Sequence, residues 1–396
     1  MRLIGHHDLG GFGNGGEGLG LQRTRDGRRV LYIAHESAPK NFTVIDVTDP
    51  SQPRMLAQKE LPHREMRSNS LDVVGDLLVV AYQTARPGLT PAGVELFDVS
   101  DPTNPRSIAF FDRSGPHSRG THCLWFVDGQ YMHLSSGAPD FVPTSPRDDQ
   151  FHTIVDVRNP TKPVEVGRWW LPGTRQGDDA PPPTRHKRLD SGFRTHNTNV
   201  YPQRPDRAYV GYIDGGIVIL DIADMAHPKL ISRLDYHPPL PGFTHTVVPL
   251  FERGLLIVTD EATRPRGEDW PKLTWVVDAS EETNPVIVGS LPLPPVEEFV
   301  KRGARFGAHN IHENHPVPTA FRSDTLVFGA FFSMGVRVYD VSNPFHPEEV
   351  GYYVPPAPPG SPLGAIQMND VYDDERRMIY AIDRISGGLY ILELTV

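Results

Sequence analysis

A motif built around an Asp-Val pair recurs along this chain of 396 residues and constrains its fold more than any other feature. An apolar run ends in the pair, and a turn containing proline follows, as in Leu96-Phe-Asp-Val-Ser-Asp-Pro102. The motif repeats at intervals of 52 to 65 residues and ends in a degenerate copy at Glu393. In two copies Val is replaced, by Ile222 and by Ala279. The aspartates of the other copies and of these two are Asp46, Asp98, Asp156, Asp221, Asp278 and Asp340. Self-similarity at such a period is typical of repeat architectures, so the repeat decides the fold.

Each period contains four strand signals. A first run begins near a His or Asn, as at Asn69, and an apolar run such as Leu77-Leu-Val-Val-Ala81 follows. The Asp-Val run is the third, and a fourth comes after the turn. Four strands in each of seven periods predict an all-β fold, a seven-bladed β-propeller with four-stranded blades. An open solenoid of similar modules is the alternative.

The two ends of the chain favour the closed ring. The seventh copy lacks a fourth strand, while Arg2-Leu-Ile-Gly-His-His-Asp-Leu9 matches the fourth-strand pattern of Val164–Leu171. We infer that the N-terminal strand closes the last blade and removes an open sheet edge. The whole chain is then one propeller domain, divided into 1–9 (outer strand of blade 7), 10–62, 63–115, 116–172, 173–238, 239–294, 295–355 and 356–396 (rest of blade 7).

The repeat resembles that of the LVIVD-repeat β-propeller family, whose module carries Asp-Val-Ser-Asp-Pro-x-x-Pro. Residues Asp98-Val-Ser-Asp-Pro-Thr-Asn-Pro105 show this signature intact, and Asp340-Val-Ser-Asn-Pro-Phe-His-Pro347 is a close copy. The resemblance implies a propeller but says little about chemistry, because one fold hosts many functions. The repeated aspartates are interpreted as structural, since Asx side chains satisfy turn backbone and Pro fixes φ.

Composition narrows the classes of function. A net charge of −10 gives no long-range attraction to phosphate backbones, so no nucleic-acid partner is expected. With one Cys, the chain has no internal disulfide and no multi-cysteine zinc or iron–sulfur site. No apolar run reaches 18 residues and the N-terminus lacks a signal-peptide core, which predicts a cytoplasmic protein without a membrane span.

Four histidines occupy equivalent positions at the start of the first strands of blades 3 to 6: His122, His196, His245 and His309. First strands line the channel, and they start on the face that also carries the long loops 136–150, 172–193, 261–272 and 292–306. Long loops over a rigid scaffold are usually functional. All-nitrogen sites suit Zn, Cu, Fe or Ni. We therefore predict a transition metal held by these histidines; a structural or substrate-binding role is the alternative.

Other residues on this face complete the candidate site. Glu261 and Asp214 end second strands and are candidate catalytic groups that orient a histidine or act as a base. Substrate binding is assigned to Arg194 and Arg305, which suit an anionic small molecule, and to the asparagines at the His position in blades 2 and 7, Asn69 and Asn369. In blade 1 that position falls near Glu17. Whether His312 or Cys123 joins the site is left open.

The four-histidine arrangement looks similar to that of carotenoid cleavage oxygenases, by analogy only and without a shared motif. We expect a metal-dependent enzyme acting on a small molecule at the channel mouth, with Fe or Cu favoured and Zn, Mn or Ni as alternatives. The absence of a clear carboxylate in the ring favours oxidoreductase or oxygenase chemistry. A metal-dependent hydrolase or lyase and a non-catalytic interaction scaffold are the alternatives. The oligomeric state is not predicted.

Overall fold

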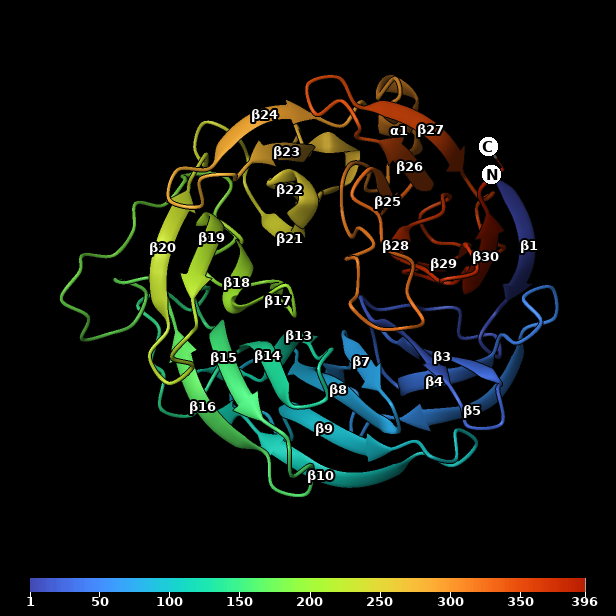
Figure 1. Ribbon diagram of the computed structural model, residues 1–396, viewed down its shortest axis with the longest axis horizontal. Helices are drawn as coiled ribbons and strands as arrows, with labels where there is room; N and C mark the ends of the chain where they lie inside the picture. The colour runs from blue at the N-terminus through green and yellow to red at the C-terminus, as the bar shows by residue number, and fades with distance from the viewer. Residues whose placement is uncertain (396) are drawn as a thin grey trace.

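Seven antiparallel sheets are arranged around a central axis in the computed structural model, which describes residues 1–395 (Figure 1). The seven-bladed propeller predicted from the repeat is confirmed. Within the blades the strands follow the chain from the axis outward, except that β1 of the N-terminus is the outermost strand of blade 7, so the first strands lie next to the channel. The first strands therefore all begin at the same end of the channel, next to the axis.

The four-stranded order holds in six of the blades. Blade 1 contains β2 (Leu19–Arg23), β3 (Arg29–Ala34), β4 (Lys40–Asp46) and β5 (Arg54–Glu60). Blade 2 contains β7 (Leu71–Val74), β8 (Leu77–Thr84), β9 (Gly93–Asp98) and β10 (Arg106–Asp112). Blade 3 contains β13 (Thr121–Trp125), β14 (Tyr131–Ser136), β15 (Phe151–Asp156) and β16 (Val164–Trp169). Blades 4 and 5 contain β17 (Thr198–Tyr201), β18 (Arg204–Tyr212), β19 (Gly216–Asp221) and β20 (Lys229–Leu234); and β21 (Thr244–Leu250), β22 (Leu255–Asp260), β23 (Thr274–Asp278) and β24 (Val286–Ser290). Blade 7 contains β28 (Met368–Asp373), β29 (Met378–Asp383), β30 (Leu389–Glu393) and β1 (Arg2–His7).

Blade 6 departs from the pattern. It has three strands, β25 (Leu326–Ala330), β26 (Val336–Asp340) and β27 (Glu348–Tyr353). An isolated bridge between Ile311 and Gly329 stands where the innermost strand would lie. The smaller elements lie outside the main strand order: β6 (Met66–Arg67), the hairpin β11 (Ser114–Gly115) and β12 (Ser118–Arg119), the 3-10 turns η1 (Phe251–Arg253) and η2 (Pro265–Gly267), and the helix α1 (Glu297–Arg302).

The N-terminal strand closes the ring, as the sequence predicts. Strand β1 pairs with β30 in antiparallel register, from Arg2 opposite Glu393 to His7 opposite Leu389. The two chain ends lie side by side in Figure 1. Leu9, which follows β1, is fully buried in the cluster between blades 7 and 1, so the closure is both hydrogen-bonded and packed.

The repeated aspartates serve the turns. In the copies at Asp98 and Asp340, Oδ1 accepts a hydrogen bond from the backbone N–H two residues on, at 2.9 and 2.7 Å. The other four aspartates make the same bond. This is the Asx-turn geometry expected of the motif, and it assigns these carboxylates to the scaffold.

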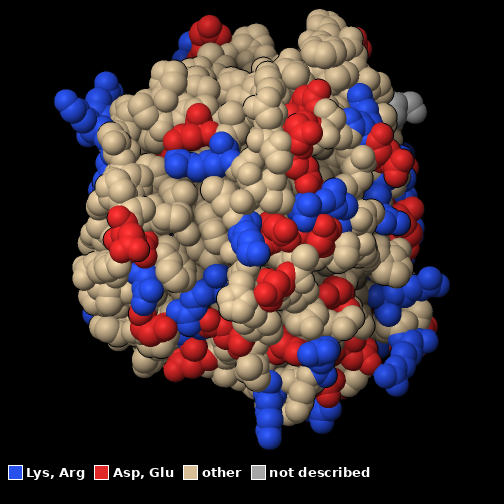
Figure 2. All heavy atoms as spheres, turned by 60° about the vertical axis from the view of Figure 1, so that its left-hand side comes forward, with Lys and Arg blue, Asp and Glu red and all other residues tan. Residues whose placement is uncertain are grey.

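Apolar side chains pack between neighbouring blades, and the polar surface lies outside. On the side seen in Figure 2, acidic and basic side chains are interleaved over the propeller. Across residues 1–395, no helix is both long and apolar enough to cross a bilayer.

Candidate metal centre

The four histidines predicted from the repeat lie together at the channel axis. The Nε2 atoms of His122 and His196 are 2.8 Å apart, and the rings of His196 and His245 have centroids 3.6 Å apart. The ring of His309 follows, with its centroid 4.8 Å from that of His245. All four side chains are buried. The repeat thus brings residues separated by 187 positions into one cluster.

A backbone irregularity lies at two of these histidines. The pairing register shifts between Thr121 and Cys123 in blade 3, and between Thr244 and Thr246 in blade 5. The residues skipped by these shifts are His122 and His245. A β-bulge leaves one residue out of the ladder and re-aims its side chain, which is why bulges are common beside functional sites. Here the bulge lets a strand residue point along the channel instead of across the sheet.

A carboxylate that the sequence analysis left without a role stands at the centre of the ring. Glu17 Oε2 is 3.6 Å from the Nε2 atoms of both His196 and His245 and 3.9 Å from that of His122. Glu17 Oε1 is 3.7 Å from His309 Nε2. The side chain is 4% exposed. The ring therefore has five members, four imidazoles and one carboxylate. The expectation that the ring lacks a carboxylate, on which the preference for redox chemistry rested, is wrong.

The glycine-rich loop that connects blade 7 to blade 1 places Glu17. The backbone N–H of Glu17 donates to Asn69 O at 2.6 Å, and that of Gly16 donates to Ala34 O at 2.8 Å. A Cβ at Gly16 would lie 2.6 Å from Asn69 O, and one at Gly18 would lie 2.4 Å from the backbone nitrogen of Leu71. Glycine is needed because the loop lies against the neighbouring backbone at these positions.

Burial and charge set the protonation of the ring. Burial lowers the pKa of His196 to about 3, and it also lowers the pKa values of His122 and His245. Burial alone would raise the pKa of Glu17, but the proximity of His245 and His309 outweighs it and holds this pKa well below the usual range. At neutral pH, Glu17 is thus an ionised carboxylate beside the neutral imidazoles of His122, His196 and His245, which is the protonation state that metal ligands require.

The donor atoms fit a metal ion. Within the described residues, Glu17 Oε2, His245 Nε2 and both ring nitrogens of His309 are buried without a hydrogen-bond partner. Such orphaned polar atoms are costly unless something binds them. Two triads have all their ligand atoms within 4.8 Å of one another: Glu17, His196 and His245, and His245, Glu261 and His309. Together they form one continuous set of nitrogen and oxygen donors.

Neutral oxygen atoms lie behind three of the imidazoles. Asn197 Oδ1 is 2.7 Å from His196 Nδ1, and Thr246 Oγ1 is 2.7 Å from His245 Nδ1. Gln83 Oε1 is 3.0 Å from His122 Nδ1. Hydrogen bonds at the outer ring nitrogen orient a ligating histidine and fix its tautomer. The ring therefore has the outer support of a metal centre.

The two candidate catalytic carboxylates lie in different places. Glu261 Oε1 is 3.6 Å from His309 Nε2 and 3.1 Å from a terminal nitrogen of Arg305, so Glu261 borders the ring. Burial raises its pKa, but the charges of His309, His245 and Arg305 outweigh this and lower it to about 2. Asp214 instead accepts hydrogen bonds from the backbone N–H groups of Ser191 and Gly192, and so anchors the loop before blade 4.

Arginines border the ring on the side that solvent reaches. Arg305 is 29% exposed, and Arg384, which is 14% exposed, lies 3.6 Å from Glu17 Oε1. Arg67 contacts His122 and, like Arg384, forms an ion pair with Glu36. These contacts surround the ring with guanidinium groups from blades 2, 6 and 7.

Arg194 and the two asparagines have scaffold contacts. Arg194 donates to Gln150 Oε1 at 2.5 Å, and burial, followed by the charge of Arg119, lowers its pKa to about 10. Asn369 Nδ2 donates to the carbonyls of Gly15 and Gly16, at 3.1 and 2.8 Å. Asn69 is fully buried, and its backbone carbonyl receives the Glu17 N–H. The asparagines thus hold the loop that carries Glu17.

Of the two residues left open, His312 is bound into the scaffold and Cys123 lies beside the ring, in contact with Asn197. His312 Nε2 is 2.7 Å from Phe321 O, and the backbone N–H of Asp373 donates to its Nδ1, so both ring nitrogens are used in the scaffold. Cys123 Sγ is 3.6 Å from Asn197 Oδ1, and burial raises the pKa of the thiol.

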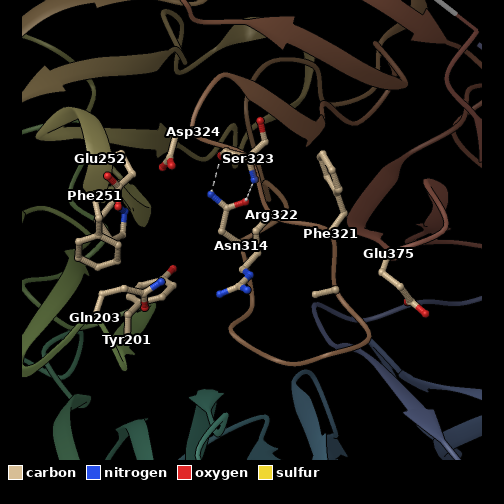
Figure 3. Close-up of a pocket in the computed structure, with 12 residues that line it drawn as sticks. Tyr201, Gln203, Phe251, Glu252, Asn314, Phe321, Arg322, Ser323, Asp324 and Glu375 are labelled. Carbon is tan, nitrogen blue, oxygen red and sulfur yellow. Dashed lines mark hydrogen bonds between the residues drawn. The ribbon is translucent and has the colours of Figure 1, made fainter.

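Two cavities lie further along the channel. An enclosed space of about 20 Å³ adjoins Glu17 and is lined by further acids, Asp72, Glu313 and Asp370. A pocket of about 410 Å³ lies where the first strands of blades 4 and 5 end, at the opposite mouth. Figure 3 shows its polar lining, with Asn314 bonded to Ser323 beside Arg322. The histidine ring and this pocket therefore belong to different ends of the channel.

Sequence reasoning assigned no role to Glu17, although the strand alignment placed the ring position of blade 1 near it. The signal was present: Glu17 follows a run of glycines and begins the first strand of its blade, as each histidine does. Arg67 was missed although it stands two positions before Asn69, as Arg194 does before His196. Arg384 follows the second strand of blade 7, outside the aligned positions, and its place depends on the packing of neighbouring blades.

The fold and site define the class, a seven-bladed β-propeller with a buried histidine and carboxylate cluster on its axis. The chain contains LVIVD repeats, since the family model for this repeat matches residues 31–58, 149–170, 206–235 and 327–354. No curated protein sequence matches it.

Among solved structures, the chain is similar to the β-propeller domain of Cps50 (Swd1) from Myceliophteria thermophila. The two are 15% identical with a TM-score of 0.57, and the match covers 96% of this chain and 98% of that one. It is also similar to Raptor from Chaetomium thermophilum, with 9% identity and a TM-score of 0.61 over the whole of this chain and 29% of that one. At these identities the similarity concerns the fold alone.

Proposed function

We propose that this propeller is a metal-dependent enzyme whose metal is held by His122, His196, His245 and His309 together with Glu17. The observation that carries the proposal is the convergence of four Nε2 atoms on one buried carboxylate, with several of these atoms lacking any hydrogen-bond partner among the described residues. A scaffold would gain nothing from burying such groups, because each unpaired polar atom costs free energy.

The charges favour a divalent transition metal. Glu17 and Glu261 bring two negative charges into the centre, and the low pKa values of both carboxyls keep them ionised. A divalent cation would balance them. Imidazole suits Fe, Cu, Zn and Ni, while carboxylate oxygens suit harder ions, so the mixed donor set favours iron over copper.

The reaction we propose is oxidoreductase or oxygenase chemistry on a small molecule at the channel mouth. When bound, the metal would supply a Lewis acid and a redox centre. A general base works best with a pKa near the operating pH. Glu261, with a pKa of about 2, is a weak base and suits metal binding or the ion pair with Arg305 better than proton abstraction. The role of general base in a hydrolase or lyase therefore does not suit Glu261.

We assign substrate binding to the partly exposed guanidinium groups. Arg305 and Arg384 lie close enough for the charge of Arg384 to lower the pKa of Arg305, after the larger effect of burial. Arg67 and Arg384 share a single carboxylate, Glu36. Positive charge therefore exceeds negative charge around the ring once a divalent metal is present, which suits an anionic substrate such as a carboxylate.

Elemental analysis tests the proposal. The purified protein, and the protein reconstituted with Fe, Cu, Zn, Mn or Ni, should hold one metal per chain. His309→Ala should lose most of it, whereas His227→Ala, which removes an exposed histidine from a turn of blade 4, should not. Absence of stoichiometric metal in the purified protein and in all five reconstituted samples would overturn the proposal.

A further inference from the structure

Five side chains form a continuous hydrogen-bonded chain across the ring. A terminal nitrogen of Arg67 lies 3.2 Å from His122 Nδ1, and His122 Nε2 lies 2.8 Å from His196 Nε2. His196 Nδ1 lies 2.7 Å from Asn197 Oδ1, and Asn197 Nδ2 donates to Glu313 Oε1 at 2.5 Å. The chain thus begins at a cation and ends at a carboxyl group.

The two ends fix the direction of every bond between them. A guanidinium only donates hydrogen bonds. At the other end, burial raises the pKa of Glu313 to about 7, and its Oε1 accepts hydrogen bonds from the NH₂ groups of both Asn197 and Asn199. Asn197 must turn its NH₂ group toward Glu313, which leaves Oδ1 to accept a proton from His196 Nδ1. His196 then carries its proton on Nδ1 and presents the Nε2 lone pair to the centre. This is the tautomer that a ligand through Nε2 requires.

Glu313 is well held for this role. Asn199 Nδ2 also donates to its Oε1, at 2.9 Å, and the hydroxyl of Tyr201 donates to its backbone carbonyl, at 2.8 Å. The side chain is 15% exposed. Both asparagines come from blade 4, the blade of His196, so the carboxylate of blade 6 is tied to the blade whose ligand it supports.

We propose that Glu313 is a positioning residue that fixes the tautomer and orientation of His196 through Asn197. The inference rests on the proposed function, in which His196 is a metal ligand. Within residues 1–395, His196 is the ring histidine whose outer acceptor is itself bonded to a carboxylate: Gln83 and Thr246 lie behind His122 and His245, and His309 Nδ1 has no partner. An outer carboxylate makes a ligating imidazole more basic and more rigid.

The same chain of hydrogen bonds implies that His122 must change its tautomer before it can bind a metal through Nε2. In the direction set by Arg67 and Glu313, His122 carries its proton on Nε2 and donates to His196. Before His122 serves as a ligand through Nε2, this proton has to leave. Gln83 Oε1, 3.0 Å from His122 Nδ1, is placed to accept a hydrogen bond from that nitrogen in the second tautomer. His196 thus has the tautomer of a metal ligand before the metal binds, whereas His122 reaches that tautomer only when its proton moves from Nε2 to Nδ1.

Two measurements on the full-length protein test the proposal. Two-bond ¹H–¹⁵N spectra of histidine-labelled protein report each imidazole tautomer without metal. A Co²⁺ titration followed by visible absorption reports affinity and ligand geometry. The variants are Glu313→Leu, which removes the acceptor, Glu313→Gln, which keeps an acceptor oxygen, and Asn197→Ala, which breaks the chain at a second point. Asp370→Asn is the matched control, since Asp370 lines the same cavity but bonds to the backbone of Val371.

We expect the Nδ1–H tautomer at His196 in the wild type and a mixture in Glu313→Leu and Asn197→Ala, with Co²⁺ affinity lower by about tenfold or more. Glu313→Gln should restore the tautomer and most of the affinity, and Asp370→Asn should match the wild type. An Nε2–H tautomer at His196 in the wild type, or equal losses in Glu313→Leu and Asp370→Asn, would overturn the inference. A wild type that has the expected tautomer but takes up no Co²⁺ would support the inference and count against the proposed function.

Discussion

The channel ring has two unlike halves built on one repeated backbone. Blades 3 to 6 each contribute a histidine to the cluster, whereas blades 7, 1 and 2 contribute Asn369, Glu17 and Asn69. The pairing register shifts around Asn369 in blade 7 as it does around His122 and His245. The asparagine side therefore has the same bulge but uses it to hold the loop of Glu17.

The difference shows that the repeat fixes where a side chain points, while the residue at that position decides its chemistry. One half supplies imidazoles whose Nε2 atoms lie around Glu17. The other half supplies a single carboxylate and the hydrogen bonds that place it. If this division is right, substitutions in the two halves should fail in different ways.

The largest expected effect comes from breaking the closure beside the asparagine half. Deleting residues 1–9 removes strand β1, its pairing with β30, and the fully buried Leu9. We expect the free energy of unfolding to fall by about 5 kcal/mol, from lost apolar burial and hydrogen bonds. Chemical denaturation of the truncated and full chains measures this, and equal stability would show that β1 does not close the ring.

The histidine half should respond with loss of metal and little loss of stability. His245→Ala removes an imidazole whose Nε2 is 3.6 Å from Glu17, so metal affinity should fall by roughly a hundredfold or more, about 2.7 kcal/mol. Isothermal titration of the metal-free protein measures the change. The matched substitution in the other half, Asn69→Ala, should change affinity by a much smaller factor. Equal losses would remove the distinction between the halves.

Buried histidines outside the ring separate the effect of burial from that of the site. His133 and His152 stack in blade 3, with Nδ1 and Nε2 3.2 Å apart, and burial lowers the pKa of His152 to about 3. The folded chain then binds fewer protons than the unfolded chain below pH 6.5. Because of this group, the free energy of unfolding should decrease as the pH is lowered, by about 1.4 kcal/mol per pH unit, or about 2 kcal/mol from pH 6.5 to pH 5.

Denaturant titrations of His152→Gln against wild type over this pH range measure that contribution. The variant should show a shallower dependence on pH than the wild type, and His227→Gln, at an exposed position, serves as the control. Identical slopes for His152→Gln and the wild type would contradict the buried neutral pair.

Most of the fold and the histidine cluster could be predicted from the repeat, because equivalent positions in a closed ring must meet at the axis. Glu17 was not predicted as a site residue, since the aligned position of blade 1 holds a residue of another type. Asp214 and Glu261 both end second strands, yet Asp214 anchors a loop and Glu261 borders the ring. Where such a side chain ends up depends on the loops of neighbouring blades, which differ in length and follow no period.

The smallest expected effect comes from a variant that keeps Glu17 but removes the hydrogen bonds that hold its loop in place. Asn369→Ala removes the hydrogen bonds to the carbonyls of Gly15 and Gly16 and the acceptor that Arg384 uses, but leaves all five ring members in the chain. Metal affinity should fall by about tenfold, the lower end of what loss of an outer contact causes. Glu17→Gln in the same titration should cost more, because it removes the charge itself. If Asn369→Ala costs as much as His245→Ala, the asparagine belongs to the metal site itself and the two halves are one.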